Sequence, residues 1–224
     1  MNAHPILTDS FPPVQIDSLH VIVHAQRFFE LCSAEVVDVR IIRGIWSNER
    51  LVSPGQRVRP THEPVRDAWM NHLQPMLDGC RLLDLFAGSG SLGLEGLSRG
   101  AASVDFVDNS ADALHALKAN VASRKLGKMK KGQRPSRHRK SARIFKRDAI
   151  PFVKQLGADA YDIALADPPY GSLKLDRVVE QWHRVPFAPV LCVEHGPGHK
   201  LPAGTHQISF EASVITIYTN SDLG

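Results

Sequence analysis

The feature that most constrains the fold is a regular alternation of short apolar runs and helix-like segments between residues 81 and 195. Each of the runs RLLDLF, SVDFVD and YDIALAD predicts a buried strand, and the segment after it has apolar residues at helical spacing. Such alternation predicts an α/β fold with a doubly wound, mostly parallel sheet. The stretch HQISFEASVITIYTN (206–220) has no helix between its two halves and predicts an antiparallel hairpin at the end of the sheet.

We expect the parallel strands at 81–86, 103–108, 142–149, 161–167 and 188–195. Ahead of them, residues 39–54 alternate like a β-hairpin with its turn near SNE (47–49). The next segment has apolar residues at helical spacing, and Thr61 can cap its start. We therefore divide the chain into an N-terminal extension of unknown role (1–38), a hairpin and helix (39–78) and a Rossmann-like domain (79–224).

The positive charge of the chain is concentrated in one block. Residues 124–147 contain 12 of the 27 lysines and arginines and no acid, which leaves the rest of the chain with a net charge of −8. A clustered basic block indicates either a polyanion partner such as RNA or a solvated loop. We favour an RNA-binding loop over residues 124–143, and we expect deletion of residues 126–141 to weaken RNA binding and flatten its salt dependence.

The remaining composition excludes several classes of protein. No apolar run reaches the length of a membrane span, and the first residues lack the pattern of a signal peptide. Cys32, Cys80 and Cys192 are scattered and are typical of core residues in a reducing cytosol. The pair His195 and His199 is the nearest approach to a metal-ligand spacing, and we expect no metal there. We expect a cytoplasmic protein that acts as a monomer.

A glycine turn follows the first predicted strand in the segment DLFAGSG. Gly88 and Gly90 allow the backbone to approach a ligand closely, although a turn of this kind is also compatible with a purely structural role. The spacing differs from the dinucleotide-binding pattern, whose glycines hold a pyrophosphate. Asp84 precedes the turn, and an acid there suits a ligand with an ammonium group rather than a phosphate.

Two further acids follow the next two strands. Asp108 can accept both hydroxyls of a ribose, although an acid is also favoured there by the dipole of the following helix. Asp148 can accept from an adenine amino group. Ammonium, ribose and adenine together describe S-adenosyl-L-methionine (SAM). The predicted cofactor-binding residues are Asp84, Phe86, Ala87, Gly88, Gly90, Asp108, Asn109, Asp148 and Ala149.

The fourth predicted strand ends in ADPPYG, which predicts a rigid loop because proline cannot continue a central ladder. The exocyclic amine of a base is a poor nucleophile until acceptors draw its lone pair out of conjugation. The Asp167 carboxylate and the Pro168 carbonyl can accept from that amine, while the two prolines fix the carbonyl in place. Tyr170 can stack on the base. We therefore predict Asp167, Pro168, Pro169 and Tyr170 as catalytic, against the alternative of a simple turn.

The segments DLFAGSGSLGLEGLSRGA and ADPPYG together resemble the RsmD-type family of bacterial 16S rRNA (guanine-N2)-methyltransferases. The segments RIIRGIWSNERL and RPTHEPVRDAWMNHL resemble the front of the same family. The resemblance runs from about Val39 to Thr219. Residues 1–38 and the long basic block depart from the family pattern.

The resemblance implies transfer of a methyl group from SAM to the exocyclic N2 of a guanine in small-subunit rRNA, free or within the ribosomal subunit. It places Arg59, Thr61 and Arg66 near the mouth of the active site, where with Tyr170 they would bind substrate. The two arginines can bind phosphate or form structural salt bridges.

Two other functions remain open at this point. D-P-P-Y also suits an N6-adenine methyltransferase on DNA or RNA, or an N5-glutamine methyltransferase on protein. A non-catalytic RNA-binding assembly factor could also retain the fold.

Overall fold

The computed structural model describes residues 39–53, 62–124, 126 and 140–223. The predicted extension (1–38), most of the basic loop, Arg59 and Thr61 lie outside the described residues. The helices are α2 (Glu63–Leu77), α3 (Ser91–Arg99), α4 (Ala111–Ala122), α5 (Ala149–Val153), α6 (Lys174–Arg184) and the 3-10 helix η1 (Asn220–Leu223). The strands are β1 (Arg81–Leu85), β2 (Ser103–Asp108), β3 (Ser141–Lys146), β4 (Ile163–Ala166), β5 (Val190–His195), β6 (His206–Ser209) and β7 (Val214–Thr219).

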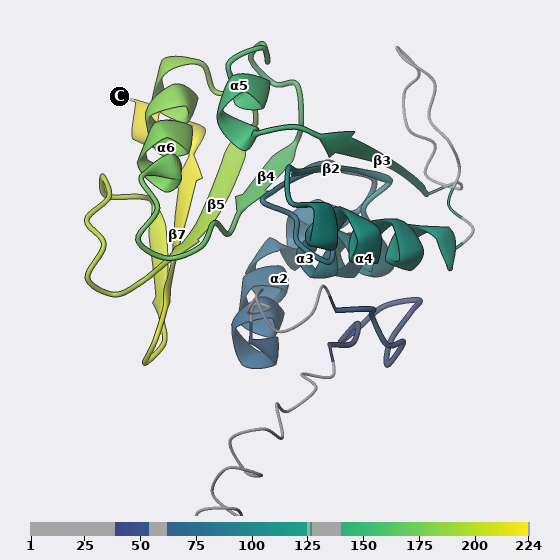
Figure 1. The fold of residues 1–224 in the computed structure, drawn as a ribbon. Helices are drawn as coiled ribbons and strands as arrows, with labels where there is room; N and C mark the ends of the chain where they lie inside the picture. The colour runs from purple at the N-terminus through teal and green to yellow at the C-terminus, as the bar shows by residue number, and fades with distance from the viewer. Residues whose placement is uncertain (1–38, 54–61, 125, 127–139, 224) are drawn as a thin grey trace, which may run out of the picture. The chain divides into compact units, whose positions relative to one another are not determined.

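Within the described residues, seven strands form one sheet in the order β3-β2-β1-β4-β5-β7-β6 (Figure 1). The first five are parallel, while β7 pairs antiparallel with both β5 and β6. The order reverses between β1 and β4, and a ligand site in such sheets lies beyond the carboxyl ends of the strands at that point. The predicted doubly wound sheet with a closing antiparallel hairpin is confirmed.

Each face of the sheet carries its own hydrophobic cluster because successive strand residues point to opposite sides. Leu82 belongs to a cluster that also contains apolar residues of α2, α3 and α4. The next residue, Leu83, belongs to a cluster with residues of α5 and α6. Cys80 and Cys192 are both buried free thiols, as expected of core residues. In the described part of the chain, no helix is long and apolar enough to cross a membrane.

The front segment, residues 39–53, forms a hairpin that is shorter than its alternation predicts: one antiparallel bridge joins Arg40 and Arg50, and three backbone hydrogen bonds cross between residues 39–41 and 48–51. The reason is that α3 takes the donors that would extend the ladder. The backbone N–H groups of Ile42 and Arg43 donate to the carboxylate of Glu95, at 2.7 and 2.9 Å. Gly44 permits this approach, because a Cβ there would lie 2.1 Å from the carbonyl oxygen of Ser98.

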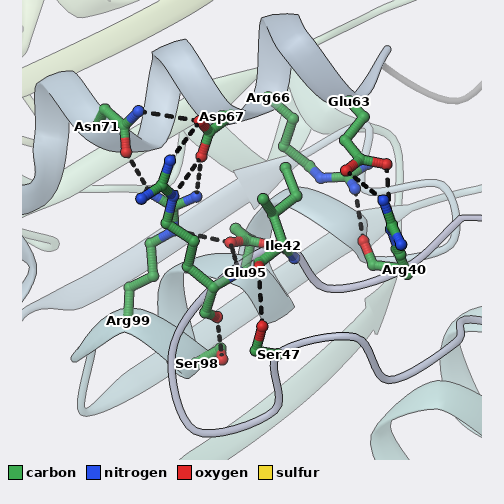
Figure 2. A network of polar contacts seen from close by, with 11 residues as sticks. Arg40, Ile42, Ser47, Glu63, Arg66, Asp67, Asn71, Glu95, Ser98 and Arg99 are labelled. Carbon is green, nitrogen blue, oxygen red and sulfur yellow. Dashed lines mark hydrogen bonds and ion pairs between the residues drawn. The ribbon is translucent and has the colours of Figure 1, made fainter.

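A network of charged groups joins the front loop, α2 and α3 (Figure 2). Glu95 is fully buried and accepts from Arg99 Nε at 2.7 Å. Arg99 also donates to Asp67 and Asn71 of α2, and Asp67 accepts from Arg43 as well. The arginine partners, Arg43 first, hold the pKa of Asp67 at about 2. Because every charge in this network meets an opposite one, it serves to fix the front loop to the sheet domain.

Helix α2 begins one residue later than predicted. Its first residue is Glu63, with His62 in the N-cap position and no side-chain cap. Pro64 lies in the first turn, where a missing backbone donor costs no hydrogen bond.

Candidate active site

The carboxyl ends of β1, β2, β3, β4 and β5 lie at one edge of the sheet. The register pairs Leu85 with Val107 and Ala166, which brings the turn after β1 beside the ends of its two neighbours. Ala166 in turn pairs with Val193 of β5. Every acid predicted to bind cofactor or substrate therefore lies on this edge or just inside it.

The turn after β1 has a strained backbone. Phe86 has a φ of 60°, in the left-handed region that non-glycine residues seldom adopt. Gly90 has a φ of 82° and is the N-cap of α3, where a Cβ would lie 2.5 Å from Leu117. The Ala87 N–H donates to Val107 of β2, and the Gly90 N–H closes the turn on Ala87 at 2.7 Å. Such strain persists only where the surroundings enforce it, and it is common at ligand sites.

Asp84 lies beneath this turn rather than on its surface. Its side chain is buried, and Oδ2 accepts from the backbone N–H of Gly93 in the first turn of α3 at 2.9 Å. Burial raises its pKa to about 7, against the lowering effect of the Gly93 hydrogen bond. This placement supports a role in fixing the turn. It does not support the expected contact with a ligand ammonium, because the carboxylate faces the protein interior.

Asp108, at the end of β2, joins two elements of the edge. One carboxylate oxygen accepts from the Gly88 N–H at 2.9 Å and the other from the Ser110 N–H at 2.7 Å. A carboxylate has about four lone-pair sites, so two of them remain available. The side chain is only half-buried. Asp108 can therefore accept from the two hydroxyls of a ribose while it holds the turn.

Asp148 caps α5 through the Ile150 N–H at 3.0 Å. Its other oxygen lies 2.7 Å from Nζ of Lys174, and the Asn109 amide donates to the same oxygen at 3.4 Å. The Lys174 hydrogen bond lowers the pKa of Asp148. The Lys174 ammonium also lies 6.0 Å from the centre of the Phe86 ring. The structure thus brings Phe86, Asn109 and Asp148 together, with a lysine that the sequence analysis did not include.

The remaining predicted cofactor residues, Ala87 and Ala149, are both buried next to these groups in the chain. Their contribution to a ligand would be through backbone rather than side chain. Together the turn, Asp108 and Asp148 form a surface with two half-buried carboxylates. A ligand could approach the backbone of the glycine turn closely there. That donor and acceptor set fits a neutral or cationic nucleoside ligand and opposes a polyphosphate.

The loop after β4 is a defined turn. The Ser172 N–H donates to the carbonyl of Pro169 at 3.3 Å, and Gly171 between them has a φ of 76°. A positive φ at the third position is typical of a type II turn. Pro168 is buried, while Pro169 and Tyr170 are exposed and Asp167 is half-buried. The loop therefore presents Asp167 and Tyr170 at the edge from a rigid backbone, as the two prolines predict.

The sequence analysis missed Glu194. It lies at the end of β5, is 5% exposed, and accepts from the hydroxyl of Tyr170 at 2.8 Å. A signal for it was present, because VLCVEH is one more buried strand with an acid near its end. Lys174 had no comparable signal, since an exposed lysine at a helix start is common.

Of the predicted substrate-binding residues of the front part, Arg59 and Thr61 lie outside the described residues, and Arg66 is described. Arg66 is 2% exposed, and its Nη2 donates to the carbonyl of Arg40 at 2.5 Å. Burial lowers the pKa of its guanidinium. A side chain this deep cannot reach an RNA phosphate, so the expected substrate contact of Arg66 is replaced by a structural one.

His195 and His199 lie with ring centres 5.9 Å apart. The His195 ring contacts Thr216 and the carbonyl of Gly196, and His199 contacts Asp176. Across the described residues, no group of three or more His, Cys, Asp or Glu side chains could hold a metal ion.

A family described as Conserved hypothetical protein 95 matches residues 39–195, from the front loop to the end of β5. This range contains every described residue of the edge. The chain belongs to this family. The resemblance to the RsmD-type proteins, drawn from the front loop, the glycine turn and the D-P-P-Y loop, is thereby confirmed.

Several curated relatives carry the same name. The chain is 36% identical over 135 residues to "Ribosomal RNA small subunit methyltransferase D" of Escherichia coli, which covers 59% of this chain and 60% of that protein. The protein of the same name from Haemophilus influenzae is 33% identical, over 59% of this chain and 64% of its own length. The chain thus matches somewhat under two thirds of the length of these relatives.

Solved structures share the fold over a larger part of the chain. An Escherichia coli structure, described as a candidate methyltransferase, superposes with a TM-score of 0.67 at 28% identity, over 81% of this chain and 97% of that one. A 16S rRNA N2 methyltransferase from T. thermophilus, solved with AdoMet and guanosine, has a TM-score of 0.59 at 16% identity and covers 79% of this chain and 48% of its own. The second likeness concerns the fold alone.

Proposed function

We propose that this protein transfers a methyl group from SAM to the exocyclic N2 of a guanine in small-subunit rRNA. The observation that carries the proposal is the D-P-P-Y turn at the end of β4, beside a sheet edge with two half-buried carboxylates. Relatives at 33–36% identity are named as methyltransferases of small-subunit rRNA. A ribosomal substrate implies the cytoplasm as the place of action.

The edge offers separate places for cofactor and base. Asp108 would accept from the ribose hydroxyls and Asp148 from the adenine amino group, with the backbone of Phe86, Gly88 and Gly90 alongside. SAM, when bound, supplies a methyl group made electrophilic by its sulfonium. A structure that shares the fold was solved with AdoMet and guanosine. The half-buried carboxylates of Asp108 and Asp148 can accept hydrogen bonds from such a cofactor, which agrees with the proposal.

Catalysis would rest mainly on position. Asp167 and the Pro168 carbonyl accept from the two N–H groups of N2, which turns its lone pair toward the methyl carbon. Bound SAM would supply the methyl carbon and leave as a neutral thioether, so the charge that this nitrogen gains would be balanced by loss of one proton. The nitrogen then releases one proton, which Asp167 can accept directly or through water. Tyr170 stacks on the base and holds its plane.

Methyl transfer from labelled SAM tests the proposal on three substrates: small ribosomal subunits that lack the modification, naked rRNA and duplex DNA. Digestion and mass analysis should give N2-methylguanosine from the ribosomal material. N6-methyladenine would keep the catalytic loop and overturn the substrate. Absence of transfer to any of the three, with SAM bound, would favour a binding protein that retains the fold.

The variant Asp167→Ala sharpens the test. We expect loss of nearly all transfer, while the affinity for SAM stays within about twofold, because Asp167 faces the base. The control is Glu180→Ala, which removes an exposed acid from α6 and should leave transfer unchanged. A large loss of SAM affinity in Asp167→Ala would contradict the assigned role.

A further inference from the structure

We propose that Glu194 is a positioning residue for the catalytic loop, and that its carboxylate holds the hydroxyl of Tyr170 so that the ring presents a fixed face to the target base. The proposal rests on the proposed function for the identity of that base. It concerns a residue on β5 that lies outside the D-P-P-Y motif.

The two side chains differ sharply in exposure. Glu194 is 5% exposed, whereas Tyr170 is 50% exposed, and the Tyr170 hydroxyl donates to Glu194 Oε1 at 2.8 Å. The tip of the tyrosine is therefore held inside the protein while much of its ring remains open to solvent. An aromatic ring that is held by its hydroxyl group and has a solvent-exposed face is suited to stacking on a base.

The other two tyrosines provide a contrast within the same chain. Tyr161 donates to Asp105 and Tyr218 to the carbonyl of Pro202, but both rings are buried in the cluster beneath α5 and α6. Core packing fixes those rings whether or not the hydroxyl bonds. Tyr170 lacks such packing, so its hydrogen bond to Glu194 has a larger share in its orientation.

The sheet register explains why Glu194 can do this. Ala166 of β4 pairs with Val193 of β5 in parallel, so the next residues along the two strands are Asp167 and Glu194. The loop leaves β4 at Asp167 and turns at Gly171, which carries Tyr170 back over the end of β5. A rigid strand thus supports a residue that a loop alone would place loosely.

The chemistry of the pair keeps the hydrogen bond in one direction. Burial, and next the hydrogen bond to Glu194, raise the pKa of the Tyr170 phenol. The phenol is the donor in the 2.8 Å hydrogen bond to Glu194 Oε1. A carboxylate accepts more strongly than a neutral oxygen, which makes the anchor stronger than one provided by an amide.

The expected consequence is preorganisation of the base site. A free tyrosine on an exposed loop would lose its rotational freedom when the base binds, whereas an anchored one has lost it already. Loss of the anchor should therefore weaken RNA binding more than it slows the chemical step. SAM affinity should be unaffected, since Glu194 and Tyr170 lie on the base side of the loop.

The kinetic test compares Glu194→Ala, Glu194→Gln, Tyr170→Phe and the double variant Tyr170→Phe with Glu194→Ala. We expect Glu194→Ala to raise KM for the RNA substrate about tenfold, the scale of one lost hydrogen bond to a charged group, with kcat reduced less. Glu194→Gln keeps the volume and an acceptor oxygen and should recover part of the loss. The double variant should raise KM for the RNA no further than the more strongly affected single variant does, because both substitutions remove the same hydrogen bond.

Losses that add up in the double variant would overturn the proposal, since Glu194 would then act independently of Tyr170. The same holds if Glu194→Gln lowers SAM affinity and thermal stability as much as RNA affinity, because the role would then be structural.

A second measurement tests the hydrogen bond between Glu194 and Tyr170 independently of methyl transfer. The chain has 3 tyrosines, so 13C-labelled tyrosine gives few ring signals in NMR, and Tyr170→Phe assigns the one of interest. In Glu194→Gln and Glu194→Ala, the Tyr170 signal should shift and narrow as the ring gains mobility, while the other two stay in place. An unchanged Tyr170 signal would overturn the anchor even if rRNA is methylated. A changed signal without methyl transfer would leave the anchor standing and reject the function.

Discussion

Two acid-rich regions of this protein differ in the groups that donate hydrogen bonds to their carboxylates. In the network between the front loop, α2 and α3, the carboxylates of Glu95 and Asp67 meet arginine side chains (Figure 2). At the sheet edge, Asp84 and Asp108 meet backbone N–H groups instead. An arginine neutralises the charge of a carboxylate, whereas the two backbone N–H groups at Asp108 orient its carboxylate without adding a formal charge.

This difference separates structural acids from candidate functional ones. A carboxylate paired with arginine has little left for a ligand, even when a cleft is near. A half-buried carboxylate fixed by two N–H groups, such as Asp108, keeps both orientation and lone pairs. The surrounding donors therefore indicate function better than the number of acids does.

The largest effect should follow from breaking the buried network. We expect Glu95→Ala to lower the free energy of unfolding by about 3–5 kcal/mol, because it removes the acceptor of Arg99 Nε and of two backbone donors of the front loop from a buried position. The control is Glu63→Ala, whose ion pair with Arg40 is largely exposed and should contribute about 1 kcal/mol or less. Urea unfolding measures both. Equal losses would show that burial does not distinguish the two pairs.

At the sheet edge, we expect substitution of an acid to lower the affinity for the cofactor rather than the free energy of unfolding. We expect Asp108→Asn to weaken SAM binding by about 10- to 100-fold, the range for hydrogen bonds to a charged group. Calorimetric titration measures the effect. The control is Asp112→Asn, an exposed acid in the first turn of α4 that should bind SAM as the wild type does. Wild-type affinity in Asp108→Asn would remove Asp108 from the cofactor site.

The buried carboxyl of Asp84 should make the free energy of unfolding depend on pH. Its folded pKa of about 7 lies above the ordinary value of 3.8, so the folded state keeps a proton that the unfolded chain has released. Stability is therefore lost as the pH rises from about 4 to about 7, and Asp84→Asn should reduce that loss of stability by about 1–3 kcal/mol. Unfolding titrations at several pH values measure it. An unchanged slope would contradict the buried, backbone-bound carboxyl, and a large loss of SAM affinity would restore the ammonium contact.

The smallest effect should come from Lys174. Its ammonium contacts the Asp148 oxygen that would face the adenine amino group, so Lys174→Met should tighten SAM binding by about two- to threefold, as expected for a partly exposed pair. The control is Lys154→Met, an exposed lysine at the end of α5. Weaker binding in Lys174→Met would mean that the lysine helps to hold the cofactor.

Much of the edge was predictable from sequence because its signals are local. A glycine turn, a proline pair and an acid after a buried strand each depend on a few neighbouring residues. Parallel strands then bring their ends together whatever the rest of the chain does. Asp108, Asp148 and Asp167 therefore lie at the expected edge.

The misplacements arise where partners are distant in sequence. Asp84 was expected to contact a ligand ammonium, and instead its buried carboxylate accepts from the backbone N–H of Gly93 in α3. Arg66 was expected to face RNA and instead bonds the carbonyl of Arg40, 26 positions away. The predicted hairpin pairs only near residues 39–41 and 48–51, because the next donor, the Arg43 N–H, bonds to Glu95 instead.

The sequence by itself determined the order of strands and helices, the glycine turn and the rigid D-P-P-Y loop, since apolar periodicity and proline geometry act over short distances. Only the tertiary structure decided which acids are neutralised and which keep their charge, and that Glu194 anchors Tyr170. Those outcomes depend on burial and on donors from other elements, and the energy of a charge changes with both far more than with its neighbours in the chain.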